Sequence, residues 1–561
     1  MEAQIDWRLI SNSGTDEGVI RPVIGAGGWP VLPGSGIKGL FRRACQDQKK
    51  LLRWCGSPAA SADPSPGILR FHGAWPADAG WTEGLLDLAH PQQNWQVGFK
   101  ADQRQNGHSA FGVVSLHRPL LHIGLSSSQP LTQEEWDEVE ATLRRALERG
   151  LGGRTSAGYG SSGKAQGELI FRCGLEGQGP AAKLLTLQPE FRPTMFRAAI
   201  RGMALRLFGG LCDERTTLQV VGQLFGSLSR EEGQNIGLLA TSYTSSATSL
   251  GSYGRGTWAQ PVYATSGQLQ WRQARPLRAG EDPELLAALL GQLHGLVVSL
   301  GGFGRSWRRP DHRIFLPDYG KTPIGCHWQW LEAERLPQGL HVQSSQDLER
   351  LLQQARASAR RWLSATKHKT GQPAPWREVL APGRVGIWTR RASDPTDAEV
   401  IRWFHHEPER DRQGQADPRD LKKTDLAGRM NHVGRIWNRL LPLTDQTAPS
   451  SGASPVGGPS SRPASPMGRP AAPTSRPGAA VQRASGPGSA VQRAPGPGRS
   501  APGARQPQAG GPVSIQAWQG PYLESVVLFP DPRDRNHGPH LAKRLDQGAG
   551  ADFRPLRFSD S

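Results

Sequence analysis

A glycine-rich stretch, residues 150–160, carries the side chains best suited to bind an anion. It reads Gly-Leu-Gly-Gly-Arg-Thr-Ser-Ala-Gly-Tyr-Gly. Glycine adopts positive φ and lets a ligand approach the main chain, and exposed backbone N–H groups bind anionic oxygens. Arg154, Thr155 and Ser156 add a guanidinium and two hydroxyls that can donate to phosphate, and Tyr159 adds a ring for stacking. The alternative is a plain turn between a helix and a strand, which is the usual meaning of an isolated Gly-x-Gly pair.

A second stretch of glycine and arginine, residues 301–309, follows an apolar helix expected over 284–300. It has the same place in the order of elements as the first stretch but lacks the closing Gly-Tyr-Gly. This correspondence indicates an internal duplication with divergence. The expected helix over 196–208 adds regularly spaced arginines.

The elements around the first glycine stretch follow a recognisable order. Strands are expected over 5–10, 67–76, 120–125 and 167–172, where apolar residues alternate or run together. One helix begins near Ile37 with Ser35 as its N-cap. Thr132 and Glu135 match a capping box that opens a second helix, which ends at Gly150. Strand, helix, two strands, helix and strand is the split βαβ, ferredoxin-like plan. The last of these strands, around residues 169–173, is alternatively the first strand of the second unit.

The predicted fold class is therefore α+β, with two tandem ferredoxin-like (RRM-like) domains. We expect domains over residues 1–172 and 173–445, the second with a helical insertion. Residues 446–515 are rich in Pro, Gly, Ser and Arg and cannot bury enough apolar surface to fold, so they are predicted to be disordered. Residues 516–561 contain a strand pattern that we expect to return to the second domain.

Composition favours a soluble protein with a polyanionic partner. The formal net charge of the 561 residues is +18, and arginine binds phosphate through a planar fork. Residues 1–6 lack the features of a signal peptide, and no apolar run is expected to span a bilayer, so we predict a cytoplasmic protein with no membrane association. The five cysteines are scattered without CxxC spacing, which predicts neither a disulfide framework nor a metal site. Cys326-His327 and His405-His406 also lack the partners that a metal site needs.

Three stretches resemble one family. The glycine loop has Gly150, Gly152, Gly158 and Gly160 in place, residues 30–42 read PVLPGSGIKGLFR, and residues 71–76 and 86–91 read FHGAWP and LDLAHP. Together they resemble the RAMP superfamily of CRISPR-associated proteins, the RRM-like backbone subunits of type III effector complexes. Residues 191–193, 200–202, 224–227 and 302–305 are similar to the larger end subunit of Cmr-type complexes. The resemblance covers roughly residues 5–310.

The resemblance implies an RNA-binding backbone subunit with guide RNA, target RNA and other CRISPR effector subunits as partners. Guide RNA would lie along the glycine-rich loops and first-helix N-termini, and a hairpin over 94–106 would act as a thumb that kinks the guide–target duplex. Such a protein contacts phosphates independently of sequence because base pairing reads the sequence. The RNA-binding candidates are Lys38, Arg42, Arg43, Gly152, Gly153, Arg154, Thr155, Ser156, Tyr159, Arg197, Arg201, Arg305, Arg308 and Arg309.

Two alternatives stay open. Some members of the family cut target RNA with an aspartate in the loop between the first strand and first helix, but here Arg21 stands where that acid is expected. Asp16 and Glu17 remain in the same loop. If the chain is an endoribonuclease, Asp16 is the catalytic candidate of the two, as a base or as a ligand of a divalent metal; no structurally bound cofactor is expected. The other alternative is a free-standing RNA-binding protein unrelated to CRISPR. A nucleotide-binding enzyme is disfavoured, because the glycine loop follows a helix and precedes a strand.

Overall fold

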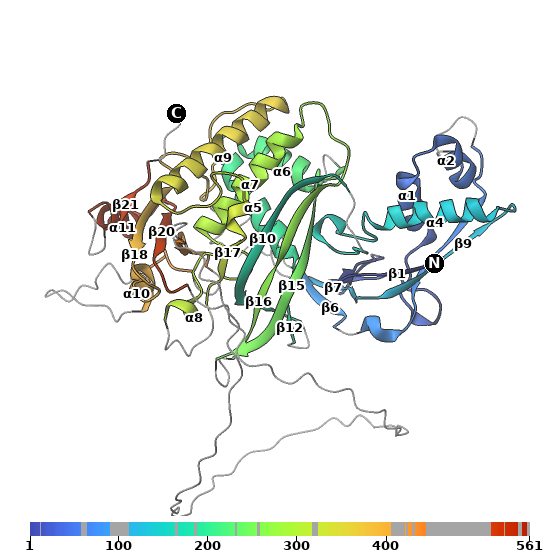
Figure 1. The fold of residues 1–561 in the computed structure, drawn as a ribbon, viewed down its shortest axis with the longest axis horizontal. Coiled ribbons are helices and arrows are strands. Elements are labelled where there is room, and N and C mark those ends of the chain that lie inside the picture. Colours follow the sequence, from blue (N-terminus) through green and yellow to red (C-terminus); the bar gives the residue numbers. More distant parts are fainter. Residues whose placement is uncertain are drawn as a thin grey trace, which may run out of the picture. The chain divides into compact units, whose positions relative to one another are not determined.

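The structure is a computed structural model (Figure 1). It describes residues 1–11, 13–57, 64–82, 84–89, 111–162, 167–184, 188–229, 233–254, 259–316, 324–405, 421, 424–428, 432–444, 518–531, 533–547 and 552–557. Residues 1–444 and 510–561 form one compact unit, and 445–509 form a second unit that lies outside the described residues. The expected thumb over 94–106 and the expected disordered segment over 446–515 also lie outside them.

The first module, residues 1–162, is built on a three-stranded antiparallel sheet in the order β1-β9-β5. Its strands are β1 (Glu2–Gln4), β9 (Leu120–Ser127) and β5 (Leu69–Pro76). The helices are α1 (Gly34–Ala44), α2 (Gln48–Cys55) and α4 (Gln133–Leu147). Apolar residues at helical spacing on α1 and α4 pack with the buried residues of the sheet to form one core.

The helix starts of this module confirm one prediction and correct another. Thr132 and Glu135 form the expected capping box, in which the Thr132 hydroxyl accepts from the Glu135 N–H and the Glu135 carboxylate accepts from the Thr132 N–H. The N-cap of α1 is Pro33 and not Ser35, which lies within the first turn of the helix. The exposed hydroxyl of Ser35 therefore caps nothing.

Smaller elements complete the first module. One sheet has the order β3-β4-β7-β6, and a two-stranded pair joins β2 to β8. Their bounds are β2 (Arg8–Leu9), β3 (Gly14–Asp16), β4 (Val19–Arg21), β6 (Leu86–Ala89), β7 (Phe111–Val114), β8 (Leu116–His117), η1 (Ala26–Gly28), η2 (Ala79–Thr82) and η4 (Thr155–Ala157).

The second module, residues 167–365, has a four-stranded antiparallel sheet in the order β15-β16-β10-β17. The strands are β10 (Leu169–Pro180), β15 (Leu239–Tyr253), β16 (Gln260–Gln273) and β17 (His327–Leu331). The helices are α5 (Thr194–Gly209), α6 (Glu214–Phe225), α7 (Pro283–Leu300), α8 (His312–Phe315), α9 (Ser345–Ala365) and η6 (Ala333–Arg335). Two short pairs join β11 (Ala182–Lys183) to β12 (Pro189–Glu190) and β13 (Ser227–Ser229) to β14 (Gly233–Asn235). In chain order the sheet reads β-α-β-β-α-β, with the first strand between the third and the fourth (Figure 1).

Helix α7 is the centre of the largest core. It packs against α5, α9 and strands β10 and β17, and its residues from Leu289 to Leu300 are all buried. By length and composition α7 is apolar enough to cross a membrane, which corrects the expectation that no run would be. Its 18-residue window is 67% buried within the protein, as suits the core helix of a soluble protein.

A third module, residues 386–557, repeats the same plan. Its sheet has the antiparallel order β19-β20-β18-β21, with strands β18 (Gly386–Ala392), β19 (Ile436–Pro442), β20 (Tyr522–Leu528) and β21 (Arg554–Pro555). Helix α10 (Glu399–His405) follows the first strand, and α11 (His537–Asp546) follows the third. The strand expected after residue 516 is thus β20, and it lies between β18 and β19.

The pairing of strand 169–180 distinguishes the two places expected for it. The strand does not complete the first sheet, because β10 pairs with β16 and β17 of the second sheet. In the first module, the Asp6 N–H donates to the Ser161 carbonyl and the Gly160 N–H to the Arg8 carbonyl. The end of the glycine-rich stretch thus lies beside the chain that follows β1.

Candidate nucleic-acid interface

The glycine-rich loop, residues 150–160, has the backbone geometry that its sequence predicts. Gly150, Gly152, Gly158 and Gly160 have φ angles of 85°, 79°, 92° and 65°, and Arg154 adopts the left-handed conformation with φ 58°. These angles explain why glycine occupies four of the positions, because a Cβ is strained there. The one side chain held in this conformation, Arg154, is exposed.

The glycines admit the protein's own backbone rather than a ligand. A Cβ on Gly160 would lie 1.7 Å from the Leu151 carbonyl oxygen, and one on Gly152 would lie 2.3 Å from that of Ile10. The N–H groups of Leu151, Gly153 and Gly160 donate to protein carbonyls at 2.9, 2.8 and 2.6 Å. The predicted phosphate cradle of backbone N–H groups is therefore wrong for these positions, since they close the loop on itself.

Tyr159 is a correction as well. It is 5% exposed, its ring lies 4.8 Å from that of Trp7, and its hydroxyl donates to Asp87 Oδ2 at 3.0 Å. Burial and the Asp87 carboxylate raise the pKa of Tyr159 well above its ordinary value, so the hydroxyl remains a donor. The ring faces inward and is not exposed for stacking on a base.

Asp87 contacts both Tyr159 of the glycine loop and a buried ionic network that the sequence did not predict. Arg192 Nη1 lies 2.7 Å from Asp87, Arg192 Nε lies 2.8 Å from Glu190, and Arg8 Nε lies 2.6 Å from the same carboxylate. Arg8 is 1% exposed and also donates to Ser115 Oγ at 2.7 Å. The network joins the first module to the segment that enters α5, so it holds the glycine loop relative to the second module.

The remaining candidates of the first module are closer to solvent. Arg154 and Arg43 are exposed, and Lys38, Thr155 and Ser156 are half-buried. Arg42 donates to the Gly56 carbonyl at 2.8 Å and so ties α1 to the end of α2. Among the candidates of this module, Arg154, Arg43 and Lys38 are therefore the cations that can meet a phosphate.

The second glycine stretch contributes one exposed arginine and two that have partners in the fold. Arg305 is exposed and donates to the Ala181 carbonyl at 3.2 Å. Arg308 forms two hydrogen bonds to Glu378 at 2.6 and 3.0 Å, and its guanidinium lies 4.7 Å from the Trp307 ring. Arg309 donates to the Gly428 carbonyl and lies over the Phe404 ring. Arg309 thus joins the second module to the third, and Arg308 joins the second module to the chain that follows it.

The two arginines proposed on α5 are buried. Arg197 and Arg201 are each 8% exposed, and Arg197 donates to the Phe225 carbonyl. Burial lowers the pKa of each to about 10, so both stay charged at neutral pH. Their positions correct the expectation of a basic helix face, because α5 is enclosed by the core.

Asp16, the catalytic candidate, lies at the end of β3 in an exposed hairpin. Its carboxylate forms an ion pair with Arg21 Nη2 at 2.6 Å, and the two side chains are 56% and 54% exposed. Within the described part of the chain, Asp16 belongs to no group of three potential metal ligands. Arg21 therefore pairs with Asp16, one of the two acids of this loop.

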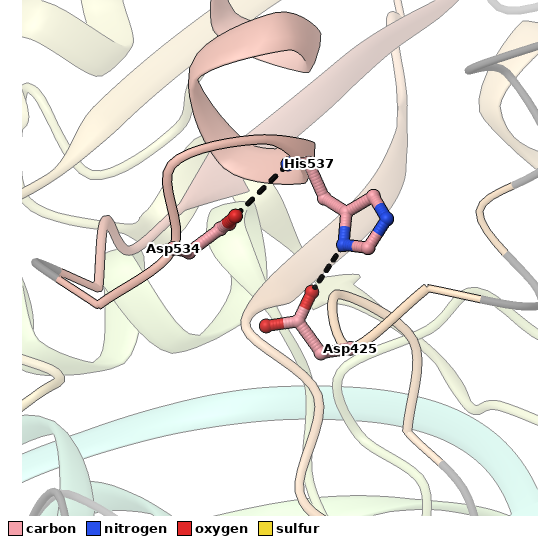
Figure 2. Close-up of side chains that lie close together, drawn as sticks. All are labelled: Asp425, Asp534 and His537. Atoms are coloured by element: carbon pink, nitrogen blue, oxygen red, sulfur yellow. Dashed lines mark hydrogen bonds and ion pairs between the residues drawn. The ribbon is translucent and has the colours of Figure 1, made fainter.

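Asp425, Asp534 and His537 form the one such group among the described residues (Figure 2). Their ligand atoms lie within 4.8 Å of one another, and His537 Nδ1 is 3.0 Å from Asp425. Arg435 Nη2 lies 2.5 Å from both carboxylates and is almost fully buried. Burial opposes the ionisation of Asp534, but Arg435 and nearby backbone N–H groups lower its pKa. The guanidinium occupies the oxygens that a cation would need, so we interpret the cluster as an ion-pair link between the chain before β19 and α11.

No protein-family model matches the sequence, and no curated protein matches it.

Proposed function

We propose that this chain is an RNA-binding backbone subunit of a type III CRISPR effector ribonucleoprotein that holds guide RNA and the guide–target duplex. The observation that carries the proposal is the repeated β-α-β-β-α-β order, with the first strand between the third and fourth, in the second and third modules. This is the ferredoxin-like plan on which RRM-like domains are built. The first module has the same order without the fourth strand.

The structure has three modules with this order of elements, the first without the fourth strand, whereas two domains were expected from the sequence. The additional unit extends the proposed RAMP fusion to the C-terminal part of the chain, and residues 443–521 join the second and third strands of that unit. A chain of tandem RNA-binding units suits a ligand that is longer than one unit. The net charge of +18 favours the binding of such a polyanion.

The proposed phosphate contacts are the exposed or half-exposed cations Arg154, Lys38, Arg43 and Arg305. Arg197, Arg308 and Arg309 instead hold the scaffold. This division separates two kinds of variant. Removal of an exposed cation weakens RNA binding, and removal of a paired arginine lowers stability.

Binding of a labelled guide-length RNA to the full chain at several salt concentrations tests the proposal. Arg154→Ala and Lys38→Ala each weaken binding by a similar factor for unrelated sequences, and each reduces the slope of log K against log salt by about one, because one fewer phosphate is neutralised. Lys369→Ala removes an exposed cation outside the glycine loops and serves as the control. Unchanged binding by both variants, or weakening that depends on RNA sequence, would contradict a phosphate-binding role.

Endoribonuclease activity through Asp16 is a second candidate, favoured by the exposure of this carboxylate in the loop before α1. Its test is cleavage of labelled target RNA by the assembled complex. Asp16→Ala abolishes one cut if Asp16 is catalytic, and Glu17→Ala is the matched control in the same hairpin. A cleavage pattern that does not change with Asp16→Ala excludes this candidate.

A further inference from the structure

Among the described residues, helices cover one face of the first sheet and leave the side chains of the other face exposed. Helices α1 and α4 pack on the buried residues of the sheet, among them Ala3, Leu121 and Ile123. Residues of opposite orientation on the same strands are exposed, as the alternation of a β-strand requires. The open face carries Glu2 and Gln4 from β1, His122, Gly124 and Ser126 from β9, and Arg70, His72 and Trp75 from β5.

Two rings of this face meet over a glycine. A Cβ on Gly124 would lie 3.3 Å from His72 Cβ and 3.6 Å from Trp75 Cζ3. His122 is paired with Trp75 across the strands, and its exposed ring adds a third. Since φ of Gly124 is not in the left-handed region, the backbone does not require glycine there. The glycine leaves room for the rings of His72 and Trp75.

Trp75 is unusually accessible for a tryptophan in the middle of a module. Trp75 is 36% exposed, and the residues beside it on this face are polar. A protein–protein interface needs a continuous apolar core, which Gln4, Ser126 and the histidines do not supply. Flat rings surrounded by hydrogen-bonding groups instead suit nucleobases, which have an apolar face and a polar edge.

The face offers one guanidinium to a phosphate, and its one carboxylate is already paired. Arg70 is exposed and donates to the Gly67 carbonyl at 2.9 Å through Nη1. Glu2 is the one acid on the face, and its carboxylate lies 3.0 Å from His122 Nε2. An approaching phosphate therefore meets a guanidinium, while the carboxylate that would repel it has a partner.

We propose that the open face of the first sheet binds single-stranded RNA by stacking its bases on Trp75 and His72, with Arg70 contacting the phosphate backbone. Stacking needs unpaired bases, so the site takes single strands and not duplex. The site is separate from the glycine loops and does not depend on the guide-binding role proposed above. It tolerates different sequences because every base has a flat face.

The test is fluorescence anisotropy of the full chain with a labelled single-stranded 10-nucleotide RNA and with a blunt RNA duplex. Trp75→Leu keeps an apolar side chain and weakens single-strand binding by roughly 5- to 100-fold, the range typical for removal of one stacked ring, and duplex binding is unchanged. Trp518→Leu, at a tryptophan that is 38% exposed in the third module, leaves both affinities as in the parent chain.

Gly124→Val provides an independent variant, because its side chain displaces the rings of His72 and Trp75 while both residues are retained. It weakens single-strand binding without loss of thermal stability beyond that of a surface substitution. The proposal is overturned if Trp75→Leu binds the single strand as the parent chain does, or if single-strand and duplex affinities fall together. Loss of guide binding by Arg154→Ala with unchanged behaviour of Trp75→Leu would remove this site and leave the proposed function standing.

Discussion

Tyr159 and Arg308 have side chains that a nucleic acid would use, yet both bind within the fold. The sequence pattern identifies the loops on which they lie but not the direction of each side chain. Tyr159 is buried because the glycines on both sides let the loop close on residues 8–10. Arg308 is paired because Glu378, far along the chain, supplies its counter-charge. Burial of this kind depends on contacts distant in sequence, so a local pattern cannot predict it.

The Tyr159 hydroxyl is expected to stabilise the protein through Asp87. Tyr159→Phe removes the donor and leaves a fully buried carboxylate oxygen without that bond, which costs about 1–3 kcal/mol. Tyr243→Phe is the matched control and costs less, because Thr265 keeps a hydrogen bond to Thr248 at 2.7 Å. Urea unfolding of the two variants measures the difference. An equal loss of unfolding free energy in both would contradict the role assigned to Asp87.

Prediction of helices succeeds where the signal is local. The capping box at Thr132 and the apolar run of α7 are both confirmed. Strand β15 was missed because its run of Ser and Thr lacks apolar alternation, and most of it is exposed. The sequence left open which sheet contains β10, because pairing is decided by contacts with β16 and β17, which lie far along the chain.

Glu378 is the main ionic link between elements of the second module and the chain that follows it. Its carboxylate contacts Arg206 of α5, Arg308 of the loop after α7, and Arg377. Burial opposes its ionisation, but Arg308, Arg206 and Arg377 outweigh burial and lower the pKa of Glu378 to about 2. The ordinary pKa of a glutamate is about 4.3.

A lowered pKa in the folded state means that the ionised carboxylate stabilises the fold above about pH 4.3. This contribution is lost as the pH falls toward 2. Glu378→Gln removes the buried carboxylate that pairs with Arg206 and Arg308, and it lowers the unfolding free energy by about 3–5 kcal/mol at neutral pH. The variant also loses less stability between pH 5 and 3 than the parent chain. Urea midpoints across this range provide the measurement, and parallel curves for the two proteins would refute the assignment.

At the scale of the whole molecule, the third module is the feature that sequence reasoning did not find. Its strands β19 and β20 are neighbours in the sheet, with Pro442 paired to Tyr522, although residues 443–521 separate them in the chain. Sequence patterns that are read in chain order do not identify two strands as neighbours when such a long insertion separates them. The return of a strand near residue 522 was predicted, but the repeat of the whole β-α-β-β-α-β plan was not.

The pairing of β19 with β20 predicts that residues 446–515 can be replaced by a short Gly/Ser turn without loss of the fold. Closing a shorter loop costs less conformational entropy on folding, so the unfolding free energy rises by about 2 kcal/mol. Thermal unfolding followed by far-UV circular dichroism measures this effect. A lower midpoint or loss of a cooperative transition would show that the segment supports the folded unit.

The central claim is that the chain holds guide RNA in a CRISPR ribonucleoprotein. Sequencing of the RNA that copurifies with the full chain and its associated subunits from its native cell tests this most directly. The account predicts RNA species that share one defined repeat-derived sequence joined to variable spacer sequence. Copurifying RNA with no shared repeat sequence, or no RNA at all, would contradict it.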